Sequence, residues 1–150
     1  MKIVFLVFLL PLMLSAQTSS VPTVENDWQY NLETAKELAN KEDKNILVYF
    51  TGSDWCAPCK VLKKDFFDTP AFSEAAKNYI LVYVDIPRNQ DLLSPEQMKQ
   101  NKEVLAEHNK KGVFPLLMVL NGKGKALDGY SGYNMDGNVR YHLQLLEKYD

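Results

Sequence analysis

Cysteine, histidine and arginine are all scarce in this sequence of 150 residues, and each scarcity excludes a class of protein. A structural zinc site needs four ligands, drawn mostly from Cys and His at short spacings. The chain has two cysteines and two histidines, and His108 and His142 lie far from the cysteines in sequence. The only arginines are Arg88 and Arg140 and the net charge is −2, which is not the pattern of a nucleic-acid-binding protein. We therefore expect neither a metal ion nor a nucleic-acid partner.

Long apolar runs are also lacking, except at the start of the chain. Basic Lys2 is followed by residues 3–14, which are almost entirely apolar. This run is shorter than the about 20 residues that a membrane-spanning helix needs. The small residues Ser15 and Ala16 follow it, before a polar segment. The pattern predicts a secretory signal peptide over residues 1–16, with an uncleaved anchor as the alternative.

The rest of the chain has the size and composition of one soluble domain. Residues 17–26 are predicted to form a flexible leader, and residues 27–150 are long enough to enclose one hydrophobic core. A signal peptide would place this domain in the periplasm or outside the cell, where the environment is oxidising. The predicted helices carry no unaccounted apolar stripe, so we expect a monomer.

The two cysteines form a C-x-x-C pair, Cys56 and Cys59, after the apolar run of residues 46–50. That spacing places two sulfurs at one end of a helix, where they form either a disulfide or a dithiol. A covalent haem site requires His after the second cysteine, and Lys60 stands there. An inert structural disulfide is a further alternative, but so short a loop constrains the unfolded chain little. The preceding Trp55 and the following helix favour redox chemistry.

Apolar periodicity and capping residues predict alternating helices and strands. The predicted helices cover residues 28–41, 57–67, 70–78, 95–109 and 138–149, and the predicted strands cover residues 46–51, 79–86, 113–120 and 125–130. Asn26 or Asp27 is expected to cap the first helix, Ser94 begins a capping box, and glycine-rich residues 121–124 predict a hairpin. The order predicts an α/β fold in which helices cover both faces of a mixed sheet.

At three places in order the chain resembles the thioredoxin superfamily, over about residues 28–149. A strand leads into the segment W-C-A-P-C at a helix start, Pro115 leads into a later strand, and a hairpin and a helix close the chain. The residues around the cysteines are most similar to secreted bacterial thioredoxin-like proteins, among them relatives of the C-terminal thioredoxin domain of the transmembrane reductase DsbD. The resemblance implies the thioredoxin fold, with a mixed central sheet flanked by helices, and thiol–disulfide exchange.

The resemblance also implies roles for the residues around the cysteine pair. Cys56 is the expected nucleophile because free N–H groups and the helix dipole stabilise a thiolate at a helix N-terminus, and Lys60 adds positive charge. Cys56 is expected to be exposed, and the more buried Cys59 is expected to resolve the mixed disulfide. Pro58 restricts the backbone between the two sulfurs. Trp55 is expected to contribute to partner docking, with ordinary packing of a large aromatic side chain as the alternative.

Pro115 is the third member of the expected site. By resemblance, its preceding peptide bond is cis, it packs opposite Cys56, and the backbone of Phe114 is free to pair with a partner strand. The alternative is an ordinary proline at the first residue of a strand.

The sequence departs from thioredoxins in the strand before the cysteines. Thioredoxins have a buried acid there that helps to deprotonate the resolving cysteine, whereas the matching residue here is Tyr49. Proton transfer at Cys59 would then involve water, Asp54 or a partner. For Asp54 we favour the interpretation that it caps its own loop. His108 and His142 are expected to be surface or packing residues.

Taken as a whole, the pattern predicts an extracytoplasmic thiol–disulfide oxidoreductase that reduces or exchanges protein disulfides. Its redox group would be the Cys56–Cys59 disulfide itself, without a bound cofactor. The expected partners are disulfide-containing exported proteins and a membrane or extracytoplasmic thiol that donates electrons. A disulfide oxidase or isomerase would differ in redox poise rather than in residues. The alternative from another class is a non-catalytic binding module with a structural disulfide, which Trp55 and Pro115 argue against.

Overall fold

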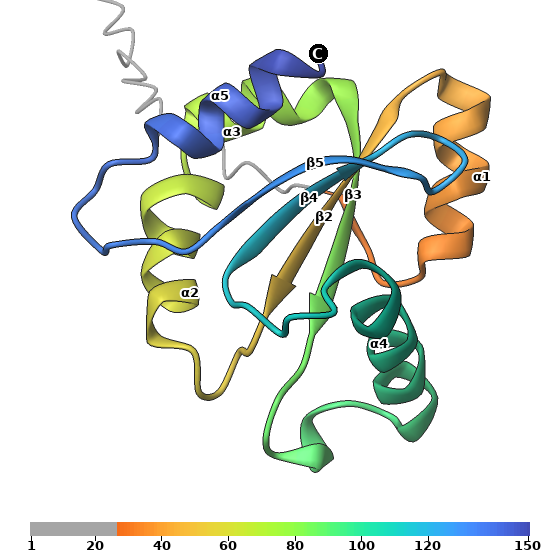
Figure 1. Ribbon diagram of the computed structural model, residues 1–150, viewed down its shortest axis with the longest axis vertical. Helices are drawn as coiled ribbons and strands as arrows, with labels where there is room; N and C mark the ends of the chain where they lie inside the picture. Colours follow the sequence, from red (N-terminus) through yellow and green to blue (C-terminus); the bar gives the residue numbers. More distant parts are fainter. Residues whose placement is uncertain (1–26) are drawn as a thin grey trace, which may run out of the picture.

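The structure, a computed structural model, describes residues 27–150, so the predicted signal peptide and leader lie outside the described residues. A five-stranded sheet with the order β1-β3-β2-β4-β5 forms its centre (Figure 1). β3 is parallel to both β1 and β2, while β4 is antiparallel to β2 and β5 is antiparallel to β4. The strands are β1 (Trp28–Gln29), β2 (Asn45–Thr51), β3 (Tyr79–Asp85), β4 (Leu116–Leu120) and β5 (Ala126–Ser131). The predicted mixed sheet is confirmed.

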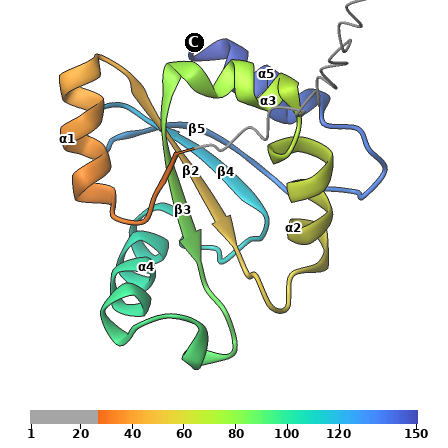
Figure 2. The same cartoon turned by 180° about the vertical axis from the view of Figure 1, so that it is seen from behind.

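Five α-helices cover the two faces of this sheet. They are α1 (Leu32–Glu42), α2 (Ala57–Leu62), α3 (Pro70–Ala75), α4 (Pro95–His108) and α5 (Arg140–Lys148). A π-helical turn (Lys63–Phe67) continues α2, and 3-10 turns lie at Ala76–Asn78 and Gln90–Leu92. Figures 1 and 2 show α1 and α4 on one side of the sheet and α2, α3 and α5 on the other.

The face under α1 and α4, here called the aliphatic face, is packed almost entirely with aliphatic side chains. Because successive side chains of a strand point to opposite faces, alternate residues of β2 and β3 line it. Its buried members are Leu32, Ala35, Ala39, Ile46, Val48, Phe50, Ile80, Val82, Val84, Leu116 and Leu120. Phe50 is the only aromatic residue among these buried members.

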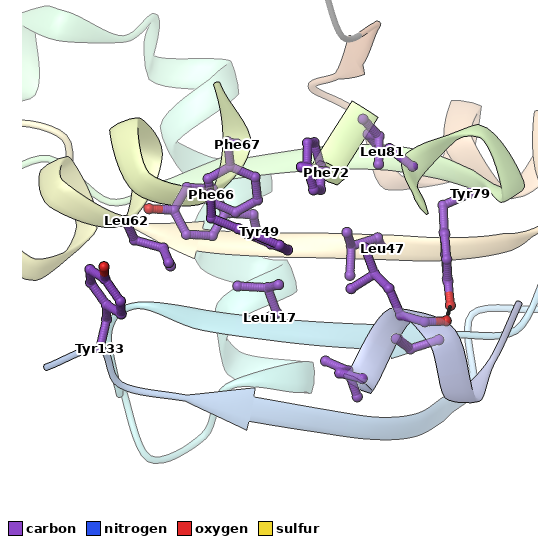
Figure 3. Packing of buried hydrophobic residues seen from close by; sticks show 14 of the residues in the cluster. Leu47, Tyr49, Leu62, Phe66, Phe67, Phe72, Tyr79, Leu81, Leu117 and Tyr133 are labelled. Atoms are coloured by element: carbon purple, nitrogen blue, oxygen red, sulfur yellow. Dashed lines mark hydrogen bonds between the residues drawn. The ribbon is translucent and has the colours of Figure 1, made fainter. Parts of the chain in front are cut away.

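The opposite face, here called the aromatic face, takes the intervening residues of the same strands together with α2, α3 and α5. Rings gather on it: Tyr49 lies 4.3 Å from Phe67, and Phe66 lies 5.0 Å from Phe72, measured between ring centroids. Figure 3 shows these rings beside Leu62 and Leu117. Both cysteines belong to this cluster. The aromatic face is therefore the part of the core that supports the redox motif.

The start of the domain differs from the prediction of a helix over residues 28–41. Trp28 and Gln29 form the short strand β1, paired with β3, and α1 begins at Leu32. The N-cap is Asn31, whose side chain accepts a hydrogen bond from the Thr34 N–H at 3.0 Å, so Asp27 does not have this role. The other predicted cap, Asn26, lies outside the described residues. The Trp28 ring packs in the aromatic face, which holds this segment in an extended conformation.

The strand predicted over residues 113–120 is shorter than expected. β4 begins at Leu116, because Pro115 has no N–H to donate to a ladder and the side chain of Asn109 binds both backbone groups of Val113. The last helix also begins two residues later than predicted, at Arg140. The strand before the cysteines, the helical segment over residues 57–67, the Ser94 cap and the antiparallel pairing across residues 121–124 are confirmed. The capping box is not completed, because the Gln97 side chain donates to the Tyr30 carbonyl and to Asn101.

Lys148 and Tyr149 are held at the end of the sheet where the central strand β2 begins. The Asn45 side chain donates to the Tyr149 carbonyl at 3.0 Å, and Lys148 forms an ion pair with Asp128 of β5. Cys56 follows the other end of β2. Between residues 27 and 150, no helix combines the length and the apolar character needed to cross a membrane.

Candidate active site

The cysteine pair lies where the loop after β2 enters α2. Cys56 is the N-cap of α2 and Cys59 lies in its first turn, and the two sulfurs are joined in a disulfide. Cys56 was expected to be the exposed member, yet its exposure is 3 %, compared with 2 % for Cys59. Burial therefore does not distinguish the two cysteines, and the difference between them has to come from their backbone surroundings.

The backbone surroundings of the two cysteines differ because only Cys56 caps the helix. The Cys59 N–H donates to Sγ of Cys56 at 3.3 Å, so Cys56 uses its sulfur as the cap of the helix. An N–H directed at a sulfur, at the positive end of a helix dipole, stabilises negative charge on that sulfur when the pair is reduced. Lys60 does not reach the sulfurs in this way, because its ammonium donates to the Asp54 carbonyl at 3.1 Å.

Two aspartates hold the loop that precedes Cys56. The carboxylate of Asp85, at the end of β3, is buried and accepts hydrogen bonds from the N–H and the hydroxyl of Ser53 at 2.8 and 2.5 Å. Asp54 accepts in return from the backbone N–H groups of Asn89 and Arg88, which hold its pKa below the ordinary value. Asp54 therefore caps a loop, as expected, but the loop is the one after β3 rather than its own. Asp85 was missed, although a lone acid ending an apolar strand was a signal for it.

Trp55 connects this loop to the segment before Pro115. Its ring nitrogen donates to the Ile86 carbonyl at 2.8 Å, and its ring meets that of Phe114 edge-on at 5.2 Å. The Arg88 guanidinium also lies over the Trp55 ring, with its carbon 4.9 Å from the ring centre. A Cβ on Gly52 would come within 2.2 Å of the Trp55 ring, so only glycine fits there. The ring is therefore held on several sides.

The Phe114–Pro115 peptide bond is cis, which confirms that prediction. Pro115 is buried and its carbonyl accepts from the Gly132 N–H at 2.9 Å. Phe114 is half-buried, and within residues 27–150 its backbone N–H and C=O have no hydrogen-bond partner. Phe114 thus has both groups available for an incoming strand, beside the Trp55 ring.

Tyr49, at the position that an acid has in thioredoxins, contacts the second cysteine. Its hydroxyl donates to the Cys59 carbonyl at 3.2 Å, and its side chain is 2 % exposed. Burial raises the pKa of the Tyr49 phenol far above its ordinary value, so it stays neutral and cannot serve as a base. What Tyr49 supplies is a fixed position for the backbone of Cys59.

The two histidines take no part in this arrangement. His142 is buried among the rings of Phe66, Tyr130 and Tyr133, and burial lowers its pKa to about 4. His108 lies at the end of α4, beside Glu107. In the described part of the chain, no three His, Cys, Asp or Glu side chains gather closely enough to hold a metal ion.

Comparisons with known proteins agree with this geometry. Residues 27–122 match the model of a family described as thioredoxin-like. The chain is 30 % identical over 127 residues to the disulfide bond reductase DsbH of Chlamydia pneumoniae, covering 83 % of this chain and 74 % of DsbH. A solved structure described as DsbH oxidoreductase superposes with a TM-score of 0.70 at 25 % identity, covering 88 % of this chain and 91 % of that chain.

A second relative is much longer than this chain. The thiol:disulfide interchange protein DsbD of Campylobacter jejuni is 32 % identical over 118 residues, which are 79 % of this chain. The match spans only 19 % of DsbD. The likeness therefore concerns one segment of that protein.

Proposed function

Because the chain belongs to the thioredoxin-like family and is a thiol–disulfide oxidoreductase, we propose that it acts outside the cytoplasm and reduces or exchanges disulfides of exported proteins. The observation that carries this proposal is the N-cap position of Cys56, whose sulfur receives the Cys59 N–H. In the reduced protein this N–H favours the thiolate of Cys56 over that of Cys59. The name of the relative DsbH, a disulfide bond reductase, supports the reducing direction.

The reaction transfers two electrons from the dithiol to a client disulfide. The Cys56 thiolate attacks one sulfur of the client, which forms a mixed disulfide and releases the other client sulfur as a thiolate that takes up a proton. The thiol of Cys59 loses its proton and attacks Sγ of Cys56. This closes the Cys56–Cys59 disulfide and releases the second client thiol. An extracytoplasmic dithiol then reduces the pair again, so no bound cofactor takes part.

The surrounding residues assist by position. Pro58 opens the helix beside Cys56, and Lys60 binds the loop through the Asp54 carbonyl. The client strand pairs with the free backbone of Phe114, next to the cis bond of Pro115 and the ring of Trp55. These contacts would hold the client cysteine near Cys56 during attack.

The proposed extracytoplasmic location is supported by the sequence at the start of the chain. We propose that residues 1–16 are removed as a signal peptide, that residues 17–26 are a leader, and that residues 27–150 act as a monomeric domain. Mass measurement of the protein exported from a bacterial host tests this, with a chain starting at Gln17 as the expected product.

The redox potential of the mature protein is the decisive measurement. The protein is equilibrated with glutathione buffers, the thiols are alkylated, and the masses are read. A potential near that of thioredoxin, about −270 mV, supports a reductant. A value near that of DsbA, about −120 mV, would instead assign an oxidase and reverse the proposed electron flow.

Trapping of mixed disulfides separates the enzyme from a binding module. Cys59→Ser leaves Cys56 free to attack but removes the resolving thiol, so this variant should accumulate mixed disulfides with exported proteins. Cys56→Ser is the matched control, because it keeps one thiol of the same pair and should trap almost nothing. Equal trapping by both variants would contradict the proposed roles.

A further inference from the structure

Arg88 lies on the Trp55 ring, beside the cysteine pair, and it is held there at two points. Its backbone N–H donates to the Asp54 carboxylate at 3.0 Å, and its guanidinium carbon lies 4.9 Å from the centre of the Trp55 ring. Trp55 is itself held by Ile86 and Phe114. A planar guanidinium stacked on a fixed ring has less freedom to lose when it binds a ligand.

The guanidinium charge of Arg88 helps to lower the pKa of the Asp54 carboxyl, but it forms no direct bond with that group. Within residues 27–150, its guanidinium N–H groups make no hydrogen bond and no ion pair. The neighbouring carboxylate of Asp54 is instead bonded to the backbone N–H groups of Arg88 and Asn89. Arg140, the other arginine of the chain, differs in this respect. It lies 4.6 Å from the Tyr141 ring but donates from its guanidinium to the Tyr141 hydroxyl at 2.7 Å.

The free guanidinium is close to the place where a client strand would lie. The Phe114 ring centre and the Arg88 guanidinium carbon lie 5.2 and 4.9 Å from the Trp55 ring centre. These two points are therefore separated by no more than about 10 Å, the span of three residues of an extended strand. A client that pairs with the Phe114 backbone therefore brings residues on either side of its cysteine within reach of Arg88.

We propose that Arg88 binds a carboxylate of the client, so that disulfides with an Asp or Glu close to the attacked cysteine are preferred substrates. The inference rests on the proposed function, because it concerns the client of the same site. Arginine suits this role since its fork of N–H donors binds both oxygens of a carboxylate. The partner class is an acidic peptide segment, and Arg88 acts as a specificity-determining residue.

The test compares disulfide-bonded peptides that differ only in Glu or Gln. Glu or Gln is placed in turn at each of the positions flanking one cysteine, and the dithiol protein, freed of excess reductant, is mixed with each peptide in single-turnover experiments. At one or more positions, Glu should raise the rate about fivefold over Gln at low ionic strength, as one exposed ion pair allows. Salt should reduce this ratio, because it screens the exposed charges.

Substitutions of the two arginines assign the preference. Arg88→Gln should bring the Glu-to-Gln ratio to about one, Arg88→Lys should keep part of it, and Arg140→Gln should leave it unchanged. A purely structural role of Arg88 would slow both peptides alike and preserve the ratio, which would overturn the inference. The absence of any Glu preference in the wild-type protein would also overturn it, while reduction of the Gln peptides would leave the proposed function intact. If the wild-type protein reduced no peptide, the proposed function would fail and the inference with it.

Discussion

The two faces of the sheet are built from the same strands but are packed in different ways. On the aliphatic face, β2 and β3 meet α1 and α4 through branched side chains and alanines. On the aromatic face, rings pack against one another beneath the redox helix, as for Phe66, Phe67 and Phe72. Two tyrosine hydroxyls there also bind helix carbonyls, Tyr49 to Cys59 and Tyr79 to Leu146 at 2.6 Å.

This difference shows how one sheet performs two tasks. Aliphatic burial stabilises the fold but has little directional preference. Ring contacts and buried hydroxyl groups have preferred geometries, so they hold a helix in one position. The face that carries Cys56 and Cys59 is the one with directional contacts. Three pairs of substitutions, one member on each face, test this comparison.

The largest effect is expected for the buried phenylalanines. Phe66→Ala should lower the free energy of unfolding by about 3–5 kcal/mol, as for other buried Phe side chains. Phe50→Ala is the matched change on the aliphatic face, because both side chains are fully buried. Phe66 has ring contacts with Phe67, Phe72 and His142, so its loss should exceed that of Phe50 by about 1–3 kcal/mol.

Urea unfolding of the oxidised protein measures both losses. The Leu variants at the same two positions provide the comparison if either Ala variant does not fold. Equal losses on the two faces would mean that ring geometry adds nothing beyond the area buried.

A second expected effect concerns the histidines, one on each side of the sheet. The ring of His142 in the folded protein stays neutral down to about pH 4, its lowered pKa, whereas the unfolded chain takes up a proton near the ordinary pKa of about 6.5. The unfolded state therefore binds more protons between these values, and stability should fall as the pH drops through this range, by up to about 3 kcal/mol.

Unfolding measured between pH 7 and 5 tests this assignment. His142→Leu should flatten the pH dependence. His108→Gln should flatten it less, because burial lowers the pKa of His108 while neighbouring Glu107 acts in the opposite direction. An unchanged slope in His142→Leu would show that this ring is not the main acid-sensitive group.

The smallest effect is expected for two helix caps. Thr69 caps α3 on the aromatic face, and its hydroxyl both accepts from the Phe72 N–H and donates to the Phe66 carbonyl at 2.6 Å. Ser94 caps α4 on the other face with one bond, to the Gln97 N–H. Thr69→Ala should cost about 1–2 kcal/mol and Ser94→Ala about 1 kcal/mol.

Thermal or urea unfolding resolves such differences. Thr69→Ser keeps the hydroxyl and should restore most of the loss. If Ser94→Ala lost more stability than Thr69→Ala, hydroxyl contacts would not explain why the two faces differ.

Much of the fold could be predicted because its signals are local. A continuous apolar run marks β2, and the Ser94 cap marks the start of α4. The strand β1 could not be predicted in this way, because two residues form a strand only through pairing with β3. Residues 113–115 look like part of a strand in sequence, but the loop bonds of Asn109 and the cis bond before Pro115 exclude them.

The residues of the site also fall into those that local sequence predicts and those that it does not. The spacing of Cys56 and Cys59 is visible in the sequence and predicts their chemistry. The roles of Asp85 and Arg88 depend on contacts with Ser53 and Trp55, more than 30 residues away, and these contacts exist only once β2 and β3 lie side by side. Sequence patterns within one segment hold no information on such contacts.

The fixed position of Tyr149 has a practical consequence for studying electron transfer. Asn45, which binds the Tyr149 carbonyl, begins β2, and Cys56 follows the far end of that strand. Seven residues of strand span about 20 Å. A linker attached after Asp150 would therefore immobilise the protein on a resin or an electrode by the end of the sheet that lies away from its sulfur pair.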